Sequence, residues 1–260
     1  MQERILEQDF FIKSSRGQMP VFAVIPSAMK ADVPPEPNAL AINTAKTIIL
    51  VHEIFGLNEH IKDVARRFAS EGFSVFAPDL FFKAKDQGLD CNDLASMRVF
   101  WQSLSDEELM ASLSGVYQLA YSFKLASSSA QGPGKIGVLG YCMGGAIASM
   151  FAGCDEKAAF LVTYYGRIKY PQLSSNKPRH PLEYVKNIRC PVLGIFSSQD
   201  DLISHGDVEL FKSTLESENI PVTIKMYDAP HAFFNDTRDT YRPEAAQDAW
   251  NATLEFLNSI

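Results

Sequence analysis

The stretch Lys135-Ile-Gly-Val-Leu-Gly-Tyr-Cys-Met-Gly-Gly-Ala-Ile-Ala-Ser-Met150 decides the fold of this chain. Its apolar beginning is typical of a buried strand, and its second half, rich in small residues, is typical of a helix. Glycines stand two positions on either side of Cys142, where ordinary side chains would collide if the strand turned abruptly into the helix. We therefore expect a sharp strand-to-helix turn with Cys142 at its tip.

This turn gives Cys142 a chemical setting that the other cysteines lack. The pattern Gly-x-Cys-x-Gly between strand and helix fits the nucleophile elbow of α/β-hydrolases. A thiol at a helix N-terminus meets the positive dipole end and free N–H groups, which favour a thiolate. The alternative is an inert buried cysteine in a tight turn, since free cysteines are often buried. That second reading is the one we adopt for Cys91, Cys154 and Cys190.

Strands and helices alternate on both sides of this turn. Residues 47–52 form a continuous β-branched run, as expected of a strand buried on both faces. Further strands are predicted at 73–78, 135–140, 159–164, 191–196 and 222–227, and helical regions at 59–71, 94–125, 143–152, 208–215 and 243–257. A hairpin at about 9–26 and a surface loop at about 27–45 precede them. The pattern predicts one α/β domain over residues 1–260, with a mostly parallel, doubly wound sheet and helices on both faces.

An acid and a histidine follow the elbow in the order that α/β-hydrolases use. Asp200 comes just past the predicted strand 191–196, with Asp201 as its competitor, and His231 lies in a loop beyond the next strand. His231 can exchange a proton with Cys142, while the acid fixes the imidazole tautomer.

The other histidines are less suited to this role. His205 follows the acid with no strand between, His180 lies in an irregular segment, and His60 falls in the first turn of a helix, where we expect it to be solvated. A zinc site at His52, Glu53 and His60 fails the HExxH spacing. We expect no metal and no cofactor.

Several motifs in chain order resemble the dienelactone hydrolase family. They span about residues 47–257 and include Val51-His-Glu-Ile-Phe-Gly-Leu-Asn58, Ala77-Pro-Asp-Leu-Phe81, Gly140-Tyr-Cys-Met-Gly-Gly145, Tyr164-Tyr-Gly166, Gln199-Asp200 and His231-Ala-Phe233.

The resemblance implies an α/β-hydrolase that cleaves a carboxylic ester or lactone through a thioester on Cys142. It implies that Glu53 contacts the resting thiol and takes its proton when substrate binds. It also implies an oxyanion hole made by the backbone N–H groups of Ile54 and Met143. From the residues alone, Glu53 is equally well read as a solvated loop acid.

Substrate choice is where the sequence departs from the family. Members of the family hold a substrate carboxylate with two arginines, one of them shortly after the histidine, where this chain has Asn235. We therefore expect no preference for anionic over neutral lactones. The candidate substrate-binding residues are Arg98, Trp101, Phe233 and Asn235. Alternative sources of positive charge are Arg98, Arg238 and Arg242.

Composition excludes several other classes of protein. The chain has 24 Lys and Arg against 31 Asp and Glu, a net charge of −7, and no dense basic run, so nucleic acid is not expected as a partner. The acidic beginning does not fit a signal peptide, and no apolar stretch reaches the roughly 18 residues of a membrane span. Four widely spaced cysteines favour a reducing, cytoplasmic location. The expected partner is a small ester or lactone, and the oligomeric state is open.

The sequence leaves two rival functions open. The first is a catalytically silent α/β-hydrolase fold that binds a ligand; the presence of the triad, Glu53 and the elbow glycines together counts against it. The second is another acyl hydrolase activity on the same triad, such as a thioesterase or peptidase, which the fold does not decide.

Overall fold

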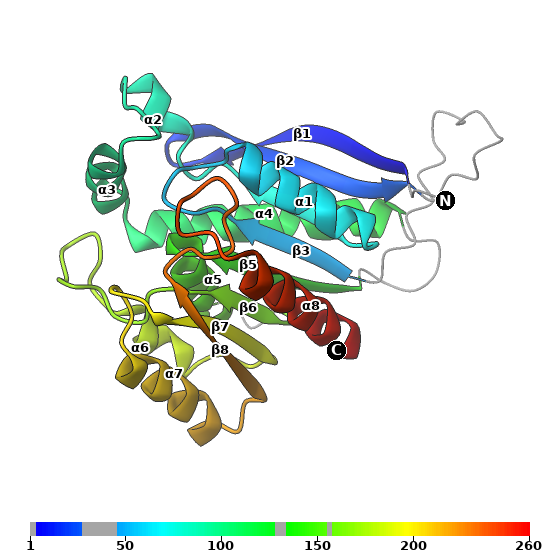
Figure 1. Cartoon of the computed structure of the whole chain (residues 1–260). Helices are drawn as coiled ribbons and strands as arrows, with labels where there is room; N and C mark the ends of the chain where they lie inside the picture. The colour runs from blue at the N-terminus through cyan, green and yellow to red at the C-terminus, as the bar shows by residue number, and fades with distance from the viewer. Residues whose placement is uncertain (1–3, 28–45, 128–133, 155–157) are drawn as a thin grey trace.

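Eight strands form one sheet in the computed structural model, which describes residues 4–27, 46–127, 134–154 and 158–260 (Figure 1). The strands are β1 (Arg4–Ser14), β2 (Gly17–Ser27), β3 (Lys46–Val51), β4 (Ser74–Pro78), β5 (Lys135–Tyr141), β6 (Leu161–Tyr164), β7 (Val192–Gln199) and β8 (Val222–Pro230). Their spatial order is β1-β2-β4-β3-β5-β6-β7-β8. The strands from β4 to β8 in this order pair in parallel, while the hairpin β1–β2 joins β4 antiparallel. The predicted α/β-hydrolase sheet is thus confirmed.

Helices cover both faces of this sheet. They are α1 (Glu59–Ser70), α2 (Phe82–Asp86), α3 (Leu94–Ser103), α4 (Asp106–Ser127), α5 (Met143–Cys154), α6 (Pro181–Val185), α7 (His205–Ser217) and α8 (Pro243–Ser259). In Figure 1, α1 and α8 lie in front of the sheet, while α4 and α5 lie behind it. The central strands β3, β4 and β6 are buried almost throughout, because a parallel sheet covered on both faces has no solvent side.

The predicted helical region 94–125 is in fact two helices, α3 and α4. The break is a capping box at Ser105 and Glu108: the Ser105 hydroxyl accepts the Glu108 N–H at 3.1 Å, and the Glu108 carboxylate accepts the Ser105 N–H at 3.1 Å. The short helices α2 and α6 were not predicted. The hairpin strands are longer than expected and run from Arg4 to Ser27, whereas nearly all of the predicted loop at about 27–45 lies outside the described residues.

His60 corrects a second expectation. It is buried in α1 and not solvated: its Nδ1 lies 2.8 Å from Asp236 Oδ1, and its ring packs edge-on against Phe234. The segment after β8, which carries His231, is thereby joined to α1.

The elbow glycines allow α5 to approach the sheet very closely. A Cβ atom on Gly144 would lie 2.3 Å from the Val51 carbonyl oxygen, and one on Gly140 would lie 2.1 Å from the Gly144 carbonyl oxygen. The atoms that a Cβ would meet belong to the backbone, so relieving the clash would require a shift of the helix or the strand. Glycine at these two positions is therefore a condition for the turn.

Gly144→Ala should lower the free energy of unfolding by about 1–3 kcal/mol or more, because the new methyl group forces α5 away from β3. The matched control is Gly206→Ala in the first turn of α7, where a Cβ meets nothing closer than 3.8 Å. This control should be neutral or stabilising by up to about 1 kcal/mol, since alanine favours the helix. Urea unfolding of both variants measures the difference, and equal stabilities would contradict this account of the turn.

Candidate active site

Cys142 occupies the tip of the turn between β5 and α5. Its φ of 54° lies in the left-handed region that non-glycine residues rarely adopt. The backbone N–H of Cys142 donates to the Tyr164 carbonyl at 2.9 Å, which ties the turn to the neighbouring strand β6. The side chain is partly exposed, and its Sγ lies 3.1 Å from His231 Nε2.

His231 and Asp200 continue this contact in a line. His231 follows β8 directly, and its Nδ1 lies 2.7 Å from Asp200 Oδ2. The Asp200 side chain, just past β7, is only 1% exposed, and its other oxygen accepts the Leu202 N–H at 2.8 Å. Asp201 is exposed. The structure therefore brings Cys142, His231 and Asp200 together and leaves Asp201 outside.

The surroundings of His231 favour its charged form. Burial is the largest single influence and lowers the pKa of His231, but the neighbouring Cys142 and the Asp200 carboxylate together raise this pKa to about 10. These two neighbours therefore favour the imidazolium, which is the partner that a thiolate requires.

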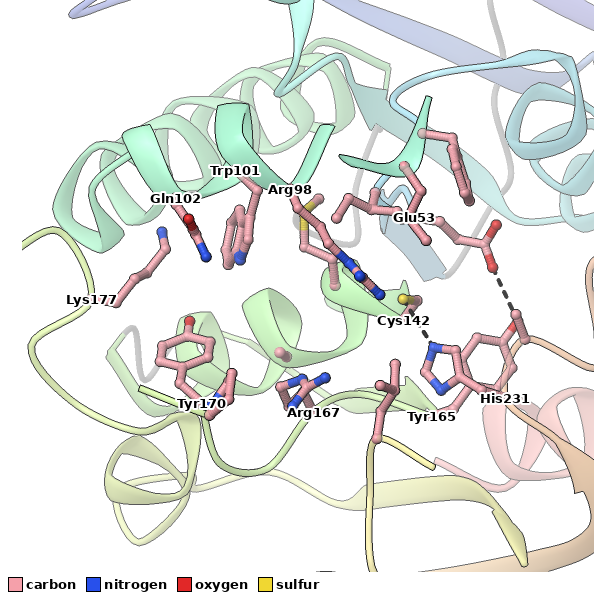
Figure 2. A pocket seen from close by; sticks show the side chains of 18 of the residues that line it. Glu53, Arg98, Trp101, Gln102, Cys142, Tyr165, Arg167, Tyr170, Lys177 and His231 are labelled. Carbon is pink, nitrogen blue, oxygen red and sulfur yellow. Dashed lines mark hydrogen bonds between the residues drawn. The ribbon is translucent and has the colours of Figure 1, made fainter. Parts of the chain in front are cut away.

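Glu53 lies on the wall of the same cavity but is held by other groups. It is 2% exposed; the Tyr165 hydroxyl donates to its Oε1 at 3.4 Å, and Asn235 Nδ2 donates to its Oε2. Burial and the nearby Glu53 charge raise the pKa of Tyr165, so this hydroxyl stays a donor. Among the hydrogen bonds of the described residues, none joins Glu53 to the Cys142 thiol, whose partner is His231 (Figure 2).

Ile54 and Met143 line the cavity beside Cys142. Met143 is the first residue of α5, so its backbone N–H has no acceptor within the helix. Ile54 follows β3 in the loop that also carries Glu53. Two residues from different elements thus line the cavity together with Cys142.

The cavity in front of Cys142 has a volume of about 910 Å³ and carries positive charge. Arg98 and Trp101 enter its wall from α3, and Arg167 and Tyr170 from the segment after β6 (Figure 2). Figure 2 shows the Arg98 guanidinium pointing towards Cys142, with Arg167 across the cavity from it. No ion pair of the described residues involves Arg98 or Arg167.

The far end of the cavity also contains a lysine, but that charge is already paired. Lys177 Nζ lies 3.0 Å from Asp106 Oδ1, donates to the Leu104 carbonyl at 2.7 Å and lies 3.7 Å from the centre of the Trp101 ring. Burial lowers the pKa of Lys177 and raises that of Asp106. This contact fixes the segment before α6 to the start of α4. The other cations of the cavity lining, Arg98, Arg167 and Arg238, have no ion pair among the described residues, and the Arg238 guanidinium lies 3.6 Å from the centre of the Phe55 ring.

Two of the predicted substrate-binding residues lie outside the cavity lining. Phe233 is fully buried and packs against Tyr165 and Tyr227. Asn235 is also fully buried, and its amide is used by Glu53 on one side and by the Thr237 N–H and hydroxyl on the other. Asn235 therefore holds Glu53 and does not reach the cavity, so the expectation of indifference to anionic lactones loses its basis.

Arg167 and Tyr165 are site residues that the sequence reasoning did not single out. Tyr165 belongs to the motif Tyr164-Tyr165-Gly166 at the end of β6, and Arg167 directly follows it. Their position at the carboxyl end of a parallel strand, where such sheets bind ligands, is the sequence signal that could have identified them.

Other kinds of site are not seen in the described part of the chain. It contains no group of three or more His, Cys, Asp or Glu side chains that could hold a metal ion. None of the helices described is both long enough and apolar enough to cross a membrane. The four cysteines, all within the described residues, form no disulfide with one another.

Comparison with known proteins agrees with the motifs. A model of the dienelactone hydrolase family matches residues 36–260. A Salmonella typhi protein named "Putative carboxymethylenebutenolidase" is 31% identical over 251 residues, 95% of this chain and 84% of that protein. An Escherichia coli K12 protein of the same name is 32% identical over 215 residues, 81% of this chain and 75% of that protein.

A solved structure shares the whole fold. The crystal structure of a Klebsiella pneumoniae protein named "Putative Dienelactone Hydrolase" matches with a TM-score of 0.80 and 29% identity, covering 99% of this chain and 100% of that one. The family match, the relatives and the shared fold lead to one conclusion: the chain belongs to the dienelactone hydrolase family, whose members are hydrolases with the α/β-hydrolase fold.

Proposed function

We propose that this protein hydrolyses a carboxylic ester or lactone through a thioester on Cys142. The observation that carries the proposal is the line of contacts from Cys142 Sγ to His231 Nε2 (3.1 Å) and from His231 Nδ1 to Asp200 Oδ2 (2.7 Å), which opens on the cavity. It has the order of groups that nucleophilic acyl transfer needs: nucleophile, base and orienting acid.

The first half of the reaction forms the thioester. His231 takes the thiol proton, and the Cys142 thiolate adds to the substrate carbonyl carbon. The resulting oxyanion accepts hydrogen bonds from the backbone N–H groups of Ile54 and Met143. When the oxyanion collapses, the bond from carbon to the leaving oxygen breaks, and His231 gives its proton to that oxygen. In a lactone the leaving oxygen stays attached to the acyl chain.

The second half releases the product. Neutral His231 takes a proton from a water molecule, whose oxygen adds to the thioester carbon. The carbon–sulfur bond then breaks, which restores the thiolate and the imidazolium and frees the acid. We assign Glu53 an auxiliary role: it is a carboxylate on the cavity wall, held there by Tyr165 and Asn235.

The substrate that this cavity fits best carries a negative charge. Arg98 and Arg167 offer two guanidinium groups that no carboxylate of the described residues neutralises, within a cavity that also contains the nucleophile. The name of the two relatives, carboxymethylenebutenolidase, itself describes a lactone ring with a carboxyl substituent. We also place the protein in a reducing, cytoplasmic compartment, because its nucleophile must remain a free thiol.

An acyl group should be found on Cys142 during turnover. When a slowly hydrolysed aryl ester is mixed with the enzyme and the reaction is quenched with acid, mass spectrometry should show the acyl mass on the peptide that contains Cys142. Cys142→Ala should lose both the adduct and the activity, whereas the control Cys91→Ala should keep both. An adduct on any other residue would remove the nucleophile assignment.

Asp200→Asn should lower kcat by about 10²-fold or more, because a neutral amide neither fixes the His231 tautomer nor stabilises the imidazolium. Asp201→Asn should have little effect, since neighbouring residues at a strand end point to opposite sides and Asp201 is exposed. Steady-state kinetics of the two variants make the comparison, and the reverse ranking contradicts the assignment.

The wild-type enzyme should prefer a lactone carboxylate to its methyl ester by about tenfold or more in kcat/KM. A charge-assisted hydrogen bond is worth roughly 1.5–3 kcal/mol, which corresponds to about one to two orders of magnitude. Arg98→Gln and Arg167→Gln should each reduce kcat/KM for the acid and leave the methyl ester unaffected. The matched control is Arg242→Gln, an exposed arginine outside the cavity lining, and it should change neither value. No preference in the wild type would refute this substrate charge.

A further inference from the structure

His52 is a fully buried histidine that directly follows β3 and does not line the cavity. Its ring makes two contacts with backbone groups: Nδ1 lies 2.6 Å from the Glu53 carbonyl oxygen, and Nε2 accepts the Leu80 N–H at 3.1 Å. Only an unprotonated ring nitrogen can accept an N–H, so the proton of the neutral ring is on Nδ1, which donates to Glu53. The contacts thus define both the charge and the tautomer.

The Glu53 carbonyl that His52 holds belongs to the same peptide unit as the Ile54 N–H. A trans peptide is planar, and its C=O and N–H point in opposite directions; the described residues contain no cis peptide bond. The carbonyl oxygen is bound by His52 and also accepts the Gly56 N–H at 3.2 Å. With the oxygen fixed on this buried side, the Ile54 N–H points away from His52, and Ile54 lines the cavity together with Cys142 and Met143.

We propose that His52 is a positioning residue that keeps the Glu53–Ile54 peptide turned so that the Ile54 N–H faces the reacting carbonyl oxygen. The inference rests on the proposed function, since an oxyanion arises only in acyl transfer. In another hydrolase, loss of one oxyanion donor lowers kcat by about 10²–10³-fold. If the Glu53–Ile54 peptide rotated by half a turn, its carbonyl oxygen would also face the oxyanion and repel it. Loss of the His52 contact should therefore lower kcat by at least about 10²-fold.

The packing around His52 suits a fixed, neutral ring. The ring stands edge-on to Phe81, with centroids 5.2 Å apart, and the Leu80 contact anchors it to the segment just after β4, the neighbour of β3 in the sheet. Burial lowers the pKa of His52, although the Asp79 charge acts in the opposite direction. On the third side, α5 packs against the backbone of Val51 and His52 through Gly144. The ring therefore joins the ends of two strands to the loop of the oxyanion donor.

Two substitutions separate the contacts of the ring. In His52→Asn the amide nitrogen can take the place of Nδ1 and still donate to Glu53, whereas Leu80 loses its acceptor. In His52→Gln the longer side chain can still accept from Leu80, but it no longer has a donor at the Nδ1 position. We expect His52→Gln to lower kcat by about 10²-fold with little change in KM, and His52→Asn to restore kcat to within about tenfold of the wild type.

Two reactions of Cys142 show whether the loss lies in the oxyanion hole. Alkylation by iodoacetamide displaces iodide from a saturated carbon and forms no oxyanion, whereas acylation by an activated ester does form one. His52→Gln should therefore alkylate at the wild-type rate and acylate about 10²-fold more slowly. An equal loss of both rates would mean a damaged triad, and acylation at the wild-type rate would mean that His52 does not position the peptide; either result overturns the inference.

The outcomes also distinguish this inference from the proposed function. If wild-type Cys142 alkylates but never forms an acyl adduct, the proposed function itself fails. If His52→Gln does not fold, folded His52→Asn decides the matter: an acylation rate 10²-fold below that of the wild type, with normal alkylation, contradicts the Glu53 contact as the cause.

Discussion

The close approach of α5 to the end of β3 is the constraint on which the rest of this structure depends. Gly144 packs against the carbonyl oxygens of Val51 and His52, at distances that leave no space for a side chain. Because the helix starts so near the strand, the first N–H of α5 and the loop after β3 border the same small volume. Cys142, forced into a positive φ by the turn, presents its sulfur to that volume. Backbone packing thus brings together Cys142 and the two residues, Ile54 and Met143, that we propose as oxyanion donors.

Charge is distributed unevenly around this point, although the whole chain carries a net charge of −7. Asp200 and Glu53 are both buried close to the reacting groups, and each is satisfied by specific donors: His231 and the Leu202 N–H for the first, Tyr165 and Asn235 for the second. The opposite side of the cavity contains the guanidinium groups of Arg98 and Arg167. A substrate anion would meet these cations while its ester carbonyl faces Cys142, which orients the substrate before the reaction begins.

The sequence predicted the parts of the molecule that local chemistry determines. The elbow glycines, the β-branched run of β3 and the order of acid and histidine after parallel strands are local signals, and the fold and the family that they indicated are confirmed. Contacts between distant segments could not be predicted in this way. Asn235 looked like a replaced arginine beside a substrate, yet its amide binds Glu53, 182 residues away in the chain. His60 looked solvated because its partner Asp236 comes from the far end of the chain. The break between α3 and α4 is different, since Ser105 and Glu108 form a capping box that the sequence displays.

The central claim is that acyl transfer occurs on Cys142 between two backbone donors. A crystal structure of the enzyme trapped with a slowly hydrolysed ester tests it most directly. The account predicts a covalent bond from Cys142 Sγ to the acyl carbon, with the acyl oxygen about 2.7–3.1 Å from the N–H groups of both Ile54 and Met143. An acyl group on another residue, or an acyl oxygen that contacts neither backbone donor, would contradict it.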